Sequence, residues 1–202
     1  MTLAVAAAIP GGAGLERQMS PVSCAAWGGN GDGIDAHDSV VRKAIRQLER
    51  VRNTLAGLGV QCREVGLDVF GAGVGVAQNG TDFVMLSVAG PADGVLNITA
   101  GLLKDISHER PKVLELCNSF TKRNPACPVY LHDAPDGWDI HMQQRFLVDV
   151  LISEPWFFRS CVEDLPVVAR SARSKFHAAG ICGRPYSWSE ADARRLLVRS
   201  LV

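Results

Sequence analysis

The sequence predicts an α+β fold: a single antiparallel sheet of about five strands with helices packed on one face. The apolar spacing alternates between helical and strand periods along the chain, in the order helix, three strands, helix, two strands, helix. A further helix is predicted at the C-terminal end. Because the connections between consecutive strands are too short for a parallel crossover, the neighbouring strands are expected to be antiparallel.

The first predicted element is an amphipathic helix that begins near Asp38 or Ser39 and ends around residue 58. Its apolar residues recur every three or four positions, at Val41, Ala44, Ile45, Leu48, Val51, Leu55 and Leu58. Basic residues such as Lys43, Arg46 and Arg50 lie on its flanks and outer face. The chain has 21 basic and 21 acidic residues, so its net charge is zero. We therefore expect a solvated helix face and no nucleic-acid partner, and keep a regulator that contacts nucleic acid through these three residues as an alternative.

Residues 60–103 change to a strand pattern. Three strands are predicted, at 65–69, 83–88 and 95–103. The glycine-rich stretch 71–75 is not followed by a helix, which a Gly-x-Gly-x-x-Gly dinucleotide-binding loop requires. It also lacks the Gly-Lys-Ser/Thr ending of a P-loop, so it fits neither phosphate-binding loop. We expect a glycine-rich turn or bulge there and no nucleotide cofactor.

The second half of the chain alternates helices and one hairpin. A helix is predicted from Pro111 to Asn124, and two hairpin strands at 129–133 and 138–148 flank a Pro-Asp-Gly turn. A long helix follows from Ser153 to Gly180, and Pro166 is expected to kink or interrupt it. A short helix near residues 189–201 completes the order.

Composition divides the chain into three parts. Residues 1–37 are rich in Ala, Gly, Ser and Pro and are expected to form a flexible N-terminal tail. Residues 38–180 form the predicted α+β domain, and residues 181–202 a C-terminal extension with a short helix. The sequence leaves open whether this extension packs on its own subunit or on another.

The predicted hairpin carries the most metal-like group of residues. His132, His141 and Asp139 fall on one face of it, and two imidazoles with a carboxylate could hold zinc. The opposite face is the apolar core side, so the histidines are expected on the wetter face, where such residues usually have no specific role. We predict no metal site and keep a metal-binding or enzymatic protein as an alternative.

No nucleophile motif is present in the sequence, and no acid–base pair can be assembled from it. The prediction is therefore a non-enzymatic protein without a cofactor. Six cysteines are spread out without a Cys-x-x-Cys pair, which is typical of free thiols in a cytoplasmic protein. No apolar run reaches the ~18 residues of a membrane helix, so no membrane association is expected.

Three consecutive aromatic residues, Trp156, Phe157 and Phe158, begin the long helix. Three neighbours on a helix cover about 200° of arc, which is too broad for one core-facing stripe. At least one of them is expected to reach a second surface, which is either an interface with a dimer partner or client or a contact within the chain, such as one with the C-terminal helix. We assign these three residues to partner binding.

Residues 38–180 also resemble a known group of proteins. The likeness rests on Val113-Leu-Glu-Leu-Cys-Asn-Ser-Phe120 in the second helix and on Val129-Tyr-Leu131 and Trp138-Asp-Ile-His-Met142 in the hairpin. Together with the order of elements, these stretches resemble the type III secretion chaperone-like fold, including the YbjN-like, actinobacterial sensory-regulator-like family. The glycine-rich stretch 71–75, Pro166 and the C-terminal helix depart from that pattern.

The resemblance implies a small α+β protein, often a homodimer, that binds another polypeptide or has a regulatory role. Secretion chaperones bind an extended client segment along exposed apolar grooves. The resulting hypothesis is a cytoplasmic, chaperone-like or regulatory module that binds a protein partner and is itself a homodimer. An immunity-type inhibitor of a toxin is a variant of the same hypothesis.

Overall fold

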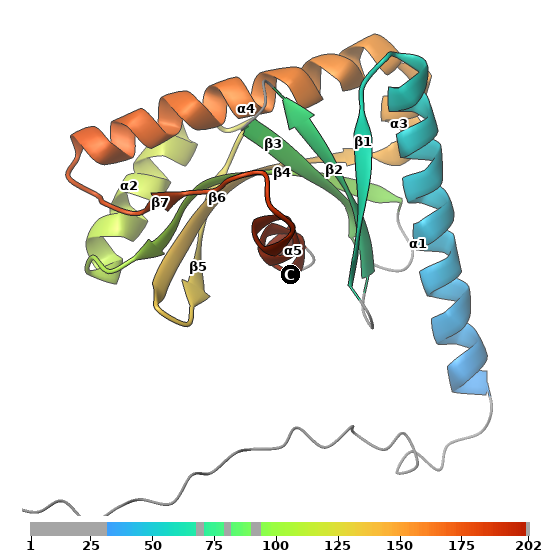
Figure 1. The fold of residues 1–202 in the computed structure, drawn as a ribbon, viewed down its shortest axis with the longest axis horizontal. Coiled ribbons are helices and arrows are strands. Elements are labelled where there is room, and N and C mark those ends of the chain that lie inside the picture. Colours follow the sequence, from blue (N-terminus) through green and yellow to red (C-terminus); the bar gives the residue numbers. More distant parts are fainter. Residues whose placement is uncertain (1–31, 68–70, 79–81, 90–93, 201–202) are drawn as a thin grey trace, which may run out of the picture.

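The computed structural model describes residues 32–67, 71–78, 82–89 and 94–200 (Figure 1). In these residues a seven-stranded antiparallel sheet has the order β1-β2-β3-β4-β6-β5, and β7 pairs with β4. The strands are β1 (Cys62–Leu67), β2 (Gly71–Gln78), β3 (Asp82–Ala89), β4 (Val95–Ile106), β5 (Val129–Ala134), β6 (Gly137–Leu147) and β7 (Arg184–Pro185). The helices are α1 (Asp32–Gly57), α2 (Arg110–Arg123), α3 (Val148–Ser153), α4 (Pro155–Ala178) and α5 (Glu190–Ser200).

The main core lies between one face of the sheet and helices α1 to α4. Alternate residues of β3 and β4, such as Val84, Leu86 and Ile98, point into it and are completely buried. The α+β class and the antiparallel order are thereby confirmed. The sheet has more strands than the five expected, because β2 and β7 also join it.

The glycine-rich stretch 71–75 was predicted as a turn or bulge, and that prediction is wrong. It belongs to β2, which pairs with β1 and β3 along its length. A Cβ atom on Gly73 would lie 2.6 Å from Leu197 Cδ1, and one on Gly75 would overlap the Trp188 ring. Glycine at these positions lets the C-terminal segment approach the strand closely.

The C-terminal segment packs on the sheet of its own chain. Figure 1 shows α5 beneath the sheet, on the face opposite α4, and α5 contacts β1 to β4. A second apolar cluster forms there, in which Met85 packs with Leu196 and Leu197. This answers the question that the sequence left open about the extension.

Two helices differ from the sequence predictions. Helix α1 begins at Asp32, before the expected start at residue 38. Residues 1–31, the larger part of the predicted tail, lie outside the described residues. Helix α4 runs on past the buried Pro166 without the predicted interruption, and residues on both sides of it, Leu165 and Ala169 among them, are buried in the main core. Within the described ranges, no helix has the length and apolar character needed to cross a membrane.

Candidate partner-binding groove

A groove of about 630 Å³ lies between α4, β6 and the loop that precedes β5. Its α4 wall is formed by Phe157, Ser160, Cys161, Asp164, Leu165 and Val168. These residues recur every three or four positions, so they form one stripe along about 16 Å of helix. The facing wall is formed by residues 125–128, Tyr130 and residues 143–146. The lining is mostly apolar, which suits a groove that binds side chains of another molecule.

The three consecutive aromatic residues divide between the core and the surface. Phe158 is completely buried, so it stabilises the fold and is not at a binding surface. Phe157 lines the groove, is 48% exposed and packs edge-on against Phe146 with 5.7 Å between ring centroids. Trp156 is 71% exposed, lies outside the groove lining and contacts the Arg159 guanidinium at 5.9 Å. Two of the three residues therefore lie outside the buried core, as the arc of three consecutive helical residues requires.

Polar atoms lie deep in the groove beside its two cysteines. Gln144 Nε2 donates a hydrogen bond to Cys127 Sγ over 3.1 Å. Gln144 Oε1 is buried and accepts no hydrogen bond from the described residues. Burial raises the pKa values of the Cys127 and Cys161 thiols, which keeps both groups protonated at neutral pH. The thiols therefore line the groove as small, uncharged and largely apolar groups.

The hairpin histidines do lie on one face, as the alternation predicts. His132 is paired with Asp139 across the hairpin, and the His132 and His141 rings stack with 4.1 Å between centroids. The expectation that this is the wetter face is wrong, because His141 is 1% exposed and Asp139 is completely buried. The C-terminal segment covers this face of the sheet, and nothing in the hairpin's own pattern predicts that.

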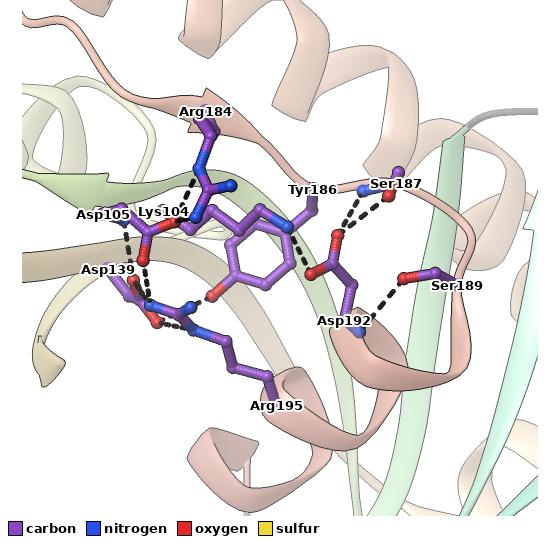
Figure 2. A network of polar contacts seen from close by, with 9 residues as sticks. All are labelled: Lys104, Asp105, Asp139, Arg184, Tyr186, Ser187, Ser189, Asp192 and Arg195. Atoms are coloured by element: carbon purple, nitrogen blue, oxygen red, sulfur yellow. Dashed lines mark hydrogen bonds and ion pairs between the residues drawn. The ribbon is translucent and has the colours of Figure 1, made fainter. Parts of the chain in front are cut away.

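Asp139 is bound by the residues that cover it (Figure 2). Arg195 of α5 donates two hydrogen bonds to its carboxylate, at 2.6 and 2.5 Å, and Tyr186 Oη donates a third at 3.0 Å. The same guanidinium also binds Asp105 at 2.9 Å, and Lys104 pairs with Asp192. In the part of the chain that the structure describes, no group of three possible ligands could hold a metal ion.

The basic residues of α1 are partly used within the fold. Arg50 forms an ion pair with Asp149 at 2.9 Å, and Arg52 pairs with Glu64 on β1. These contacts join α1 to α3 and to the edge of the sheet. Both ion pairs are largely exposed to solvent, which fits the expectation of a solvated helix face.

Several residues of the groove and of the opposite face were missed by sequence reasoning. Cys127 and Gln144 meet only because the loop before β5 folds back on β6, and Arg195 reaches Asp139 across 56 positions in the chain. One signal was present in the sequence: Gly73 and Gly75 are two positions apart and so share one face of a strand. That spacing indicates a face against which another segment packs.

Comparison with known proteins gives a structural similarity only. No protein-family model matches the chain, and no curated protein matches it. The crystal structure of YbjN from E. coli is similar with a TM-score of 0.48 and 14% sequence identity, over 66% of this chain and 93% of that one. A similarity at this level does not carry a function from one protein to the other.

Proposed function

We propose that the chain is a non-enzymatic protein-binding module, chaperone-like or regulatory, whose groove receives a segment of a partner polypeptide in the cytoplasm. The observation that carries this proposal is Phe157, an aromatic side chain that lines the large groove and stays half exposed. Covering the rest of that ring with a partner stabilises a complex by about 1 kcal/mol from apolar area alone. Aromatic anchors in pockets are the usual centres of such interfaces.

The remaining groove residues support binding rather than catalysis. The two thiols are protonated, and the one acidic residue in the lining, Asp164, is exposed on α4. A groove whose lining is mostly apolar, with few polar groups, suits the binding of apolar side chains of a peptide.

We also propose a homodimer, as expected from the sequence. Leu147, Val150 and Trp156 are exposed apolar residues close together in the chain, at the end of β6, in α3 and at the start of α4. None of the three belongs to the lining of the groove. Light scattering on the purified chain tests this, with a dimer expected and Trp156→Glu expected to shift it to a monomer. A monomer for the unmodified chain contradicts this part of the proposal.

The partner-binding proposal is tested by capture from the lysate of the protein's own host. Tagged wild-type chain is compared with Phe157→Glu, which places a charge in the groove. Val198→Glu is the matched control, because Val198 is an exposed apolar residue on α5, on the opposite face of the sheet. We expect one dominant protein that survives high-salt washing with the wild type and the control and is lost with Phe157→Glu.

Two results of this capture contradict the proposal. One is an absence of any stoichiometric protein in the wild-type sample, and the other is equal capture by all three chains. The identity of a captured protein separates the variants of the hypothesis, because a toxin indicates an immunity role and a secreted or unfolded client indicates a chaperone role.

A further inference from the structure

The groove runs along a stretch of β6 that has no neighbouring strand on one side. Strand β5 begins at Val129, which pairs with Met142, whereas β6 continues to Leu147. On the other side, β6 stays paired with β4 as far as Leu147. The sheet therefore has an open edge at the end of β6, and residues 143–146 of that edge line the groove.

The hydrogen-bond pattern shows which backbone groups face the open side. The Gln143 N–H donates to the Pro128 carbonyl over 3.1 Å, on the β5 side, and the Val148 N–H donates to the Gly94 carbonyl over 2.7 Å, on the β4 side. Because backbone groups alternate sides along a strand, Arg145 directs its N–H and carbonyl to the β5 side. Within the described residues, no backbone hydrogen bond reaches Arg145 from that side.

The side chains around this edge set the chemistry of an added strand. Gln144 and Phe146 point to the α4 side, whereas Arg145 points to the opposite face. Arg145 is exposed and forms no ion pair with any described residue. Asp164 on the α4 wall is also exposed. An acidic side chain is therefore favoured opposite Arg145 and disfavoured toward α4.

We propose that the groove binds an extended peptide as an additional strand, antiparallel to the end of β6 and in line with β5. Its backbone pairs with Arg145. Its alternate side chains are apolar residues that enter the α4 wall beside Phe157, and the residue directly opposite Arg145 is acidic. This inference rests on the proposed function and specifies its partner as a short β-strand with alternating apolar and acidic residues. The apolar α4 wall is long enough for about five residues of extended chain.

The test uses a phage library of random dodecapeptides selected on the full-length wild-type chain, and the enriched peptides are then measured for binding to the wild type and to Arg145→Pro. Proline removes the outward N–H of an edge position without removing a bond to β4. Arg145→Glu keeps the backbone and reverses the charge, and Arg46→Glu, on an exposed residue of α1, is the matched control. Enriched peptides are then synthesised with N-methyl groups on one alternating set of amides or on the other.

We expect enriched peptides with strict alternation of apolar and acidic residues. N-methylation of the alternate peptide amides that face β6 should weaken peptide binding about tenfold, because it removes their hydrogen bonds to the strand. N-methylation of the other alternate amides, which face away from β6, should change the binding little. Arg145→Glu should weaken the binding of these peptides by a similar factor, and Arg46→Glu should leave it unchanged. Amide exchange at Arg145 should slow on binding, whereas Phe146, whose N–H already faces β4, serves as an internal control.

The inference is overturned if no peptide is enriched, if the enriched peptides show helical spacing, or if they bind Arg145→Pro as well as the wild type. Peptides that do not bind Phe157→Glu but still bind Arg145→Pro would contradict strand addition and still support the groove as the binding site. Peptides that ignore Phe157→Glu as well would contradict both.

Discussion

At the scale of single residues, glycines on the sheet decide whether the C-terminal segment can dock. Gly75 and Gly101 face the rings of Trp188 and Tyr186, and a side chain at either position would overlap a ring. The docking of the C-terminal segment thus depends on the absence of a side chain at these glycines as much as on apolar contacts. Such positions are not identifiable from hydropathy, because glycine contributes almost nothing to the apolar pattern.

Gly101→Ala is expected to destabilise the fold by about 1–3 kcal/mol, because the added methyl group meets the stiff base of the Tyr186 side chain. Gly66→Ala is the control, since a Cβ there meets nothing within 4 Å. Urea unfolding measures both. Equal midpoints for the two variants would show that the C-terminal segment is not seated on Gly101.

The buried Asp139 gives a second prediction at this scale. Arg195→Met removes its charged partner and leaves a completely buried carboxylate, for which a loss of about 3–5 kcal/mol in the free energy of unfolding is expected. Adding Asp139→Asn should recover part of that loss, because an amide needs no counter-charge. If Arg195→Met unfolds at the wild-type urea concentration, the ion pair does not hold α5.

At the scale of elements, the strands that could be predicted were those with their own apolar pattern. The run 83–88 became β3, the run 95–103 became part of β4, and the hairpin became β5 and β6. Strand β2 was missed because glycine has low strand propensity, and β7 because it has only two residues. Strand β2 pairs with β1 and β3, its neighbours in the chain, whereas β7 pairs with β4, which is distant in the chain.

Helix α5 should dock less stably in acid. Burial alone would raise the pKa of Asp192, but hydrogen bonds from Lys104 and Ser187 outweigh it and lower that pKa. A carboxyl whose pKa is depressed in the folded state contributes stability above its ordinary value of about 3.9 and loses it as the pH falls through the lower value. Trp188 fluorescence, taken as the difference from Trp188→Phe, should therefore shift to the red below about pH 4.

The control for this titration is Asp192→Asn, which should show a weaker docking at neutral pH and a smaller change in acid. A titration curve identical to that of the wild type would mean that Asp192 does not carry the pH dependence.

At the scale of the whole molecule, the face covered by α5 could not be predicted from the sequence. The pattern of the hairpin placed His132 and His141 correctly relative to each other, because alternation along a strand is local. Their burial is caused by the segment that follows α4, and no local sequence pattern in the hairpin predicts that this segment covers them. The groove was predictable only in part: the helical arc required at least one of Trp156, Phe157 and Phe158 to leave the core, without saying which, and the open edge of β6 follows from where β5 begins.

Removing residues 181–202 should expose the second apolar cluster, which includes Phe83 and Met85. We expect the shortened chain to bind the dye ANS and to unfold at lower urea than the full chain, because apolar surface and the partners of Asp139 are lost together. Wild-type stability without ANS binding would show that α5 is dispensable for the fold.

The central claim is that the groove beside α4 holds a partner polypeptide. Its most direct test is a calorimetric titration of the captured partner, once purified, into the wild type, Phe157→Glu and Val198→Glu. The account predicts a Kd at least about tenfold weaker for Phe157→Glu, since a charge replaces an aromatic anchor, and an unchanged Kd for Val198→Glu. Equal affinity for all three chains would place the partner elsewhere on the molecule and contradict the account.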